Sequence, residues 1–232
     1  LNMGVYVKLI ASTQNAEKVV AAAAKLCWSP SGAAEILDGL DESKTASFLN
    51  KLREAGHLSP FEHASFTFAV ENLSRVATHQ LVRHRVASYS QQSQRYVAMN
   101  GNEVIIPPSI ASNDEALKVF SEASKAAGIA YEKLVSLGVP KEDARFILPH
   151  GGDTRIVVTM NARELHHFFA LRLCRRAQWE IRELAREMLR EARKASPMLF
   201  ESAGPACVTS GKCHEAHPCG KSYADMEDLL AK

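Results

Sequence analysis

The sequence has few aromatic side chains, 7% of its 232 residues, and almost no net charge. Its 28 Lys and Arg residues nearly balance 26 Asp and Glu residues, which leaves a net charge of +2. Proteins that bind nucleic acid over a broad surface are usually strongly basic, so this balance argues against that class. Apolar residues make up 46% of the chain, so we also exclude disordered, collagen-like and coiled-coil chains.

Long apolar runs and an even set of cysteines are also missing. No run approaches the roughly 18 apolar residues of a membrane-spanning helix, and residues 19–24 form one of the longest runs. The first residues lack the basic segment and apolar stretch of a secretory signal. Five cysteines, an odd number, do not suggest a disulfide framework. We therefore expect a cytoplasmic protein with no membrane partner.

Short β-rich segments and helical segments alternate without a regular repeat, which predicts an α+β fold. We expect an antiparallel sheet with flanking helices and one long helix near the C-terminus. Neither GxGxxG nor GxxxxGK[ST] is present, so no standard phosphate-binding loop is predicted. Expected strands cover residues 5–11, 64–71 and 154–161. Expected helices cover residues 15–27, 31–39, 41–55, 74–89, 113–137, 143–148 and 162–195.

The densest chemistry lies between residues 80 and 96. Three arginines and a histidine fall within 13 residues, and no acidic residue occurs between Arg75 and Glu103. Clustered guanidinium groups repel one another and suit an anionic partner such as a phosphate. Five Ser and Gln residues at positions 88 and 90–93 would line a polar site better than they would fill a core. We interpret the segment as an anion-binding site; a solvated basic helix face is the alternative.

A second set of polar residues is spaced along the expected helix 162–195. Leucine and phenylalanine residues surround it, so its arginines either line a pocket or extend along the surface into water. Both interpretations are open from spacing alone. The set comprises Asn161, Arg163, His167, Arg172 and Arg176.

Two isolated residues are further candidates. His63 follows a turn and precedes an expected strand, a position from which it could contact a ligand, although a structural histidine is the commoner case. Arg145 lies in an expected short helix, where it could instead serve as a favourable cation near the helix C-terminus.

These residues together resemble one family. The sequence Arg-His-Arg at positions 83–85, followed after seven residues by Ser93, resembles the signature RHR(x7)S of the flavin-dependent thymidylate synthases. Residues 60–63 (Pro-Phe-Glu-His) resemble that family's PFEH segment, and residues 145–149 resemble its R-x-x-LP segment. Residues 161–181 resemble its C-terminal helix. Order and spacing agree over roughly half of the chain.

The resemblance implies a methyltransferase that converts dUMP to dTMP in de novo dTMP biosynthesis. The methylene group would come from methylenetetrahydrofolate, and the hydride from FAD that NADPH has reduced. The family forms homotetramers with active sites between subunits, and no nucleic acid is expected as a partner. We expect residues 1–203 to form one catalytic domain that binds FAD and dUMP, and residues 204–232 to form a tail rich in Cys and His.

The motif match also implies two sets of site residues. Those expected to bind dUMP are Gln80, Arg83, Ser93, Gln94, Arg95, Arg145 and Arg172. Those expected to bind FAD or to shape its pocket are His63, Arg83, His84, Arg85, Gln91, Asn161, Arg163 and His167.

Arg172 and Ser93 are the expected catalytic residues. Arg172 beside a pyrimidine carbonyl could stabilise developing negative charge. A serine nucleophile needs a neighbouring base, and the sequence near Ser93 offers no acid, so we expect Ser93 to position dUMP. Many family members have Asn-Glu where this chain has Ser90-Gln91, so one carboxylate is missing from the expected site.

The tail offers metal-ligating residue types at an unusual spacing. The spacing C-x5-C and C-x3-H-x-C matches no standard pair of C-x2-C motifs. We predict no metal and reduced thiols in a mobile tail; a zinc-organised interaction protein is the alternative. The residues are Cys207, Cys213, His214, His217 and Cys219.

An RNA-binding module built on the basic segment is a second alternative function. Single-stranded RNA is usually held by bases stacked on a platform of aromatic side chains. The segment offers only Tyr89 and Tyr96 for such stacking.

Overall fold

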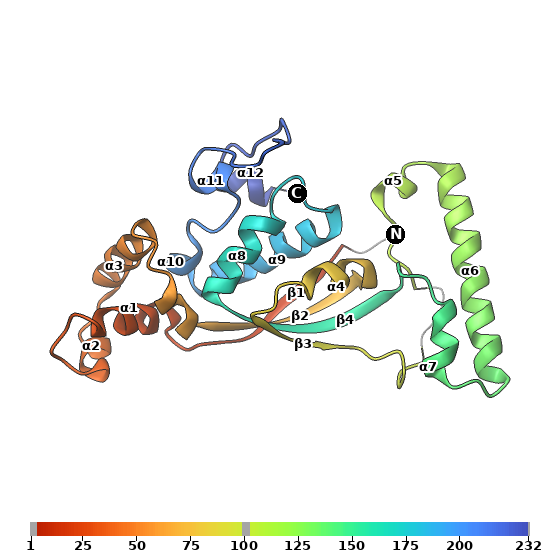
Figure 1. Ribbon diagram of the computed structural model, residues 1–232, viewed down its shortest axis with the longest axis horizontal. Helices are drawn as coiled ribbons and strands as arrows, with labels where there is room; N and C mark the ends of the chain where they lie inside the picture. The colour runs from red at the N-terminus through yellow and green to blue at the C-terminus, as the bar shows by residue number, and fades with distance from the viewer. Residues whose placement is uncertain (1–3, 99–102, 232) are drawn as a thin grey trace. The chain divides into compact units, whose positions relative to one another are not determined.

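The computed structural model describes residues 4–98 and 103–231, and it has the predicted α+β fold. Four strands form one sheet in the order β1-β2-β4-β3 (Figure 1). The strands are β1 (Tyr6–Ser12), β2 (Ser65–Ser74), β3 (Ala87–Gln91) and β4 (Asp153–Asn161). The expected strands correspond to β1, β2 and β4, whereas β3 was not predicted.

The central pair of strands, β2 and β4, is antiparallel. The Thr67 and Thr159 hydroxyl groups lie 2.9 Å apart across the pair. Three residues before Thr67 and three residues after Thr159, the Ala162 amide donates to the Ala64 carbonyl at 2.8 Å. Because a residue just before β2 pairs with a residue just after β4, the two strands run in opposite directions. The predicted antiparallel sheet is therefore confirmed for this pair.

Helices precede, interrupt and follow the strands. The expected helices at 15–27, 31–39, 41–55 and 113–137 are confirmed, and the one at 143–148 is a short helix that ends in a 3-10 turn. The helices are α1 (Ala16–Leu26), α2 (Ala33–Asp38), α3 (Glu42–Glu54), η1 (Ser59–His63), α4 (Arg75–Leu81), α5 (Pro108–Ala111), α6 (Asp114–Ser136), α7 (Lys141–Ala144), η2 (Arg145–Ile147), α8 (Ala162–Arg172), α9 (Trp179–Ala195), α10 (Pro197–Phe200), α11 (Ala206–Thr209) and α12 (Met226–Leu230).

The chain forms two compact units. Unit 1 comprises residues 1–6, 70–83 and 90–157, and unit 2 comprises residues 7–69, 84–89 and 158–232. The unit boundaries fall within strands, so β2 and β4 each contribute residues to both units. The expected division of the chain at residue 203 stays a prediction.

Aromatic side chains build the core of unit 2. Phe66 and Phe68 alternate with partly exposed neighbours along β2, the pattern of a strand with one buried face. The Phe66 ring meets the Phe200 ring edge to face at 5.1 Å between centroids, and Phe168 and Phe169 of α8 are fully buried. Each such side chain contributes roughly 1.5–3 kcal/mol on burial. This core fixes α8, which lies beside α9 (Figure 1).

Unit 1 anchors α4 at its N-terminal end. The Arg75 amide donates to the Gly152 carbonyl and the Val76 amide donates to the His150 carbonyl, each at 3.2 Å. The Ser74 hydroxyl accepts from the Ala77 amide at 3.1 Å. Three of the amide groups that a helix leaves without partners in its first turn are thereby satisfied.

The predicted helix over residues 74–89 is wrong beyond α4, which ends at Leu81. The chain then turns and continues as β3 at the edge of the sheet, where the Gln92 amide donates to the Arg155 carbonyl at 2.9 Å. Pairing with a neighbouring strand replaces the helical hydrogen bonds in this serine-rich segment. Strand preference depends strongly on such tertiary contacts, which local sequence does not reveal.

The predicted single helix over residues 162–195 is also wrong, because α8 and α9 are separate. The Gln178 side chain accepts from two backbone amides at the start of α9, both at 3.0 Å. The Arg182 side chain donates to the Ala177 carbonyl at 2.8 Å and so holds the connecting segment from the other side. Glutamine is not among the residues preferred at this capping position, so the break carried no clear signal.

The C-terminal tail contains the short helix α11. Beyond it, α12 packs on α9: Leu229 is fully buried, and the Arg186 side chain donates to its carbonyl at 3.0 Å. The Arg175 guanidinium lies 4.0 Å from the centroid of the buried Tyr223 ring. Within residues 4–98 and 103–231, no helix has the length and apolar character needed to cross a membrane.

Candidate active site

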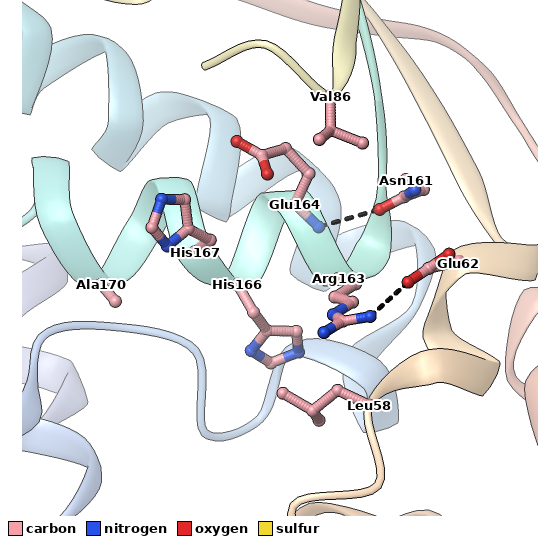
Figure 2. Close-up of a pocket in the computed structure, with 9 residues that line it drawn as sticks. All are labelled: Leu58, Glu62, Val86, Asn161, Arg163, Glu164, His166, His167 and Ala170. Atoms are coloured by element: carbon pink, nitrogen blue, oxygen red, sulfur yellow. Dashed lines mark hydrogen bonds and ion pairs between the residues drawn. The ribbon is translucent and has the colours of Figure 1, made fainter. Parts of the chain in front are cut away.

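A cavity of about 690 Å³ in unit 2 is built along α8 (Figure 2). Asn161 caps this helix, and its side-chain oxygen accepts from the Glu164 amide at 2.8 Å. The cap fixes the first turn of α8 and so fixes the positions from which its side chains reach the cavity. The cavity is lined by Leu58, Glu62, Val86, Asn161, Arg163, Glu164, His166, His167 and Ala170.

The cavity wall carries a cation and a neutralising acid side by side. Arg163 forms an ion pair with Glu62, which lies on η1 (Figure 2). Both side chains are about half exposed, at 52% and 48%. An exposed pair of this kind is weak, so an anionic ligand can compete with Glu62 for Arg163. The exposed His167 lies on the next turn of the same helix.

His84 lies next to the cavity and is almost completely buried, with 3% of its side chain exposed. Its Nδ1 atom is 2.9 Å from a carboxylate oxygen of Glu164, and its Nε2 atom is 3.0 Å from Nε of Arg172. Burial lowers the pKa of His84, and the Arg172 charge acts in the same direction, whereas Glu164 opposes them. His84 thus links the last residue of α8 to the cavity wall.

His166 has a structural role on the opposite side of the helix. Its Nε2 atom is 2.8 Å from the Leu199 carbonyl, and its ring stacks on Phe200 at 5.6 Å and meets the edge of Phe61 at 5.7 Å. Burial lowers the pKa of His166 to about 4. The ring is therefore neutral near pH 7, and it forms part of the cavity wall, where its contacts with Leu199, Phe200 and Phe61 hold it in place.

Unit 1 gathers a second group of cations, which we call the arginine cluster: Arg75, Arg95 and Arg145. Nε of Arg95 is 2.7 Å from the Glu142 carboxylate, and Nε of Arg145 donates to the Glu142 carbonyl at 3.1 Å. The Glu142 carboxylate raises the pKa of Arg95. Arg75 donates to the Gln92 carbonyl at 2.9 Å, and its pKa is lowered first by burial and then by the Arg145 charge.

The segment next to the arginine cluster contains Ser93. Its hydroxyl accepts from the Arg95 amide at 3.2 Å. Across the part of the chain that the structure describes, neither a histidine nor a carboxylate lies within hydrogen-bonding distance of this hydroxyl. The geometry is compatible with a positioning role for Ser93 and offers no general base.

The remaining unit 1 candidates differ in how they are held. Gln91 donates to the hydroxyl groups of Thr78 and Thr154, at 3.3 and 3.2 Å, so its amide is engaged within the protein. Gln94 is nearly buried, with 8% exposed. Arg83 is exposed, and its guanidinium has no ion pair or hydrogen bond with any residue in the described ranges. Gln80 is partly exposed on α4.

The structure therefore brings together several of the predicted residues within each unit. Asn161, Arg163 and His167 share the cavity of unit 2, with His84 and Arg172 joined beside them. His63 and Arg85 are exposed and do not line that cavity. In unit 1, Arg95 and Arg145 meet at Glu142.

The sequence analysis singled out cationic and neutral polar residues and missed the acidic partners of the cations. Glu62, Glu142 and Glu164 each contact a predicted site residue. Glu164 carried a usable signal, because it stands three residues after Asn161, the spacing of a helix cap followed by an acidic residue. Glu142 carried none, because its partner Arg95 is 47 residues away in sequence.

A metal site does not fit the cluster of His84, Glu164 and His167. One potential ligand atom from each lies within 4.8 Å of the others. Both ring nitrogens of His84 are nevertheless engaged by Glu164 and Arg172, so a metal would have to displace one of them. Among the described residues this is the only such group, so the cysteines and histidines of the tail do not converge on one point.

Comparison with known proteins identifies the family. Residues 8–198 match the family described as "Thymidylate synthase complementing protein". The chain is 50% identical over 244 residues to the flavin-dependent thymidylate synthase of Clostridium tetani, covering 98% of this chain and 97% of that protein. It is 51% identical over 227 residues to the enzyme of the same name from Geobacter sulfurreducens, covering 97% of each.

A solved structure has the same fold. The crystal structure of the UMP/dUMP methylase PolB from Streptomyces cacaoi bound with 5-Br dUMP superposes with a TM-score of 0.74 and 26% sequence identity. The match covers 85% of this chain and 93% of that chain. The predicted resemblance is confirmed by the sequence matches over nearly the whole chain, and the protein belongs to the thymidylate synthase complementing protein family.

Proposed function

We propose that the protein is a flavin-dependent thymidylate synthase that methylates dUMP to dTMP. The observation that carries the proposal is the placement of the family's motif residues: one group lines the cavity of unit 2, and another forms the arginine cluster of unit 1. Relatives about 50% identical over nearly the whole chain carry that enzyme name, and the structural neighbour is described as a UMP/dUMP methylase.

The residues of the unit 2 cavity fit a flavin. A diphosphate needs hydrogen-bond donors, which the Arg163 cation and the His167 ring offer. The polar edge of a flavin ring needs amide donors and acceptors, which Asn161 offers. Leu58, Val86 and Ala170 supply apolar surface for the ring system. When bound and reduced by NADPH, the flavin would supply the hydride that converts the transferred methylene group to a methyl group.

The arginine cluster of unit 1 fits the phosphate of dUMP. Arg95 contacts the Glu142 carboxylate and Arg145 contacts the backbone carbonyl of the same residue, so both guanidinium groups are anchored on Glu142 and can contribute to one phosphate site. Arg83, which is outside the arginine cluster as defined above, is exposed and has no acidic partner in the described ranges, so it is a further cation of unit 1 available to an anion. Ser93 and Gln94 lie on the same segment, and we assign them to positioning the nucleotide.

Arg172 is the proposed catalytic residue. Methylation at C5 of uracil requires negative charge to develop on the pyrimidine ring, and a preorganised cation next to a ring carbonyl lowers the energy of that state. Nε of Arg172 is held by His84, so its two terminal nitrogens are left to donate to the carbonyl. Ser93 orients the substrate and does not form a covalent bond with it.

The remaining parts of the reaction follow from the family. Methylenetetrahydrofolate is the proposed methylene donor, NADPH the proposed reductant, and a homotetramer with active sites between subunits the proposed assembly. We also propose that the enzyme acts in the cytoplasm, where dTMP synthesis would use these soluble cosubstrates. The RNA-binding alternative has little support, because Tyr89 is partly buried and its hydroxyl donates to the His84 carbonyl at 2.8 Å.

A direct assay tests the proposal. The purified protein should show the visible absorption spectrum of a flavin, should oxidise NADPH, and should convert dUMP to dTMP only when methylenetetrahydrofolate is present. A protein that remains colourless after incubation with FAD, or that forms no dTMP when all cosubstrates are supplied, would contradict the proposal.

A further inference from the structure

Three side chains of unit 2 form a continuous chain from a carboxylate to the proposed catalytic arginine. Glu164 contacts Nδ1 of His84 at 2.9 Å, and Arg172 contacts Nε2 of the same ring at 3.0 Å. The side chains of Glu164 and His84 are 11% and 3% exposed, so water barely reaches their contact. Glu164 lies within the matched segment 161–181 but was not among the expected site residues.

The hydrogen-bond donors among these three side chains determine which ring nitrogen of His84 carries the proton. Arginine has five N–H groups and no acceptor, so Arg172 donates and Nε2 of His84 must accept through its lone pair. Nδ1 must then carry the hydrogen, which it donates to the Glu164 carboxylate. The neutral tautomer with hydrogen on Nδ1 is the only one that satisfies both contacts.

We propose that Glu164 is a positioning residue that sets this tautomer of His84 and thereby fixes the guanidinium of Arg172 for the reaction. The inference rests on the proposed function, because it assigns a purpose to the orientation of Arg172. A carboxylate that holds a histidine tautomer, which in turn holds a reacting group, is a known physical arrangement in enzymes and metal sites.

The arrangement also predicts how acid acts on the site. Protonated His84 would point an N–H at the Arg172 cation, which removes the contact and adds repulsion. The groups that face the ring are Glu164 and His167 of α8 and Arg172 at its end; Tyr89 of β3 donates to the His84 carbonyl. Glu164 raises the pKa of His84 against burial and Arg172, so loss of its charge should lower that pKa.

The first experiment needs no variant. Nitrogen NMR of isotope-labelled histidine in the whole protein at neutral pH should show the His84 ring with hydrogen on Nδ1 and a bare Nε2. The signal is assigned by its disappearance in His84→Asn. Hydrogen on Nε2 in the wild-type ring would overturn the proposal whether or not the enzyme makes dTMP.

The second experiment is Glu164→Gln, which keeps the shape of the side chain and removes the charge. We expect kcat for dTMP formation to fall about 10- to 100-fold, as for other residues that orient a reacting group through a histidine. The dissociation constant for dUMP should change by less than about threefold, because the phosphate contacts lie elsewhere. The acid limb of the kcat profile should move to lower pH, a change that a merely structural defect would not produce.

Glu187→Gln is the matched control, because Glu187 pairs with Arg190 on α9 and does not line the cavity. Its kcat and pH profile should match those of the wild type. An active wild type whose kcat and acid limb are unchanged in Glu164→Gln would overturn the inference alone. An inactive wild type would instead overturn the proposed function, and the NMR result would still decide the tautomer.

Discussion

The arginines of the two units are held in different ways. In unit 2, Arg172 donates to a buried histidine that a carboxylate holds in turn, and Arg163 pairs with Glu62 on the cavity wall. In unit 1, Arg95 and Arg145 share the single exposed residue Glu142. Arg172 is fixed before any ligand arrives, whereas Arg163 and the unit 1 arginines are held by exposed contacts that a ligand can replace.

The difference corresponds to two functions, stabilisation of a transition state and binding of a phosphate. A group that stabilises charge developing during a reaction must be oriented in advance, because reorganisation at that moment raises the barrier. A group that captures a phosphate can exchange a weak protein contact for a strong bidentate one. We therefore expect substitutions at Arg172 to act on the chemical step and substitutions in the arginine cluster to act on affinity.

Arg172→Ala should have the largest effect. Removal of one preorganised donor to a developing anion typically slows the chemical step about 100- to 1,000-fold, and we expect a loss of that size in single-turnover dTMP formation. Arg172→Lys keeps a charge but loses the planar fork, so it should recover only part of the rate. Arg155→Ala, which removes an exposed arginine of β4 paired with Glu71, is the control and should be near normal. If Arg172→Ala formed dTMP at the wild-type rate, Arg172 would not act on the chemical step, and the proposed difference between the arginines of the two units would be wrong.

Acid should lower the free energy of unfolding of unit 2 because His166 becomes protonated. Its pKa is about 4 in the folded protein, below its ordinary value of 6.5, so the unfolded chain binds more protons between these values. The stability that the neutral ring contributes is complete above about pH 6.5 and is lost as the pH falls toward 4, a loss of roughly 3 kcal/mol.

Urea unfolding at neutral pH and near pH 4.5 measures this effect. Carboxylates also titrate in this range, so the quantity to compare is the pH-dependent loss in wild type against that in His166→Gln. The variant should start less stable and lose roughly 2–3 kcal/mol less on acidification. Equal losses in the two proteins would show that His166 is not the acid-sensitive support of the cavity wall.

The sequence predicted residue types better than it predicted their partners. The family resemblance, and not spacing alone, assigned Asn161, Arg163 and His167 to one site. The structure keeps them together because residues on a single helix keep their relation whatever surrounds them. The pairing of Arg95 with Glu142 was invisible, since it joins segments that only the tertiary fold brings together.

The predicted helices over residues 74–89 and 162–195 were wrong for a related reason. Strand β3, which was not predicted, depends on pairing with a neighbouring strand. The break before α9 depends on the unusual Gln178 cap. Local sequence carries helix propensity, which tertiary contacts override. The antiparallel core strands were predictable because one buried face imposes alternation on the sequence itself.

Arg145→Ala should have an intermediate effect, and it tests whether the unit 1 arginines act on dUMP affinity. It removes one proposed phosphate contact, so the dissociation constant for dUMP should rise about 10- to 100-fold, the usual range for a hydrogen bond to a charged group. The rate with saturating dUMP should change much less. Calorimetry for dUMP binding beside single-turnover rates separates the two, with Arg155→Ala as the control. A slow enzyme with normal dUMP affinity would place Arg145 with Arg172, and the contrast between capture and catalysis would fail.

Glu142→Gln should have the smallest effect on dUMP binding, and it should increase the affinity where Arg145→Ala decreases it. In the free protein the Glu142 carboxylate occupies Nε of Arg95, which a phosphate must take from it. The pair is about half exposed on both sides, so it is weak, and its loss should tighten dUMP binding only about two- to fivefold. Salt screens exposed charges, so the gain measured by calorimetry in dilute buffer should vanish at high ionic strength. Weaker binding in Glu142→Gln would mean that Glu142 orients Arg95 for the phosphate, so that unit 1, like unit 2, would hold its cation in place before the ligand arrives.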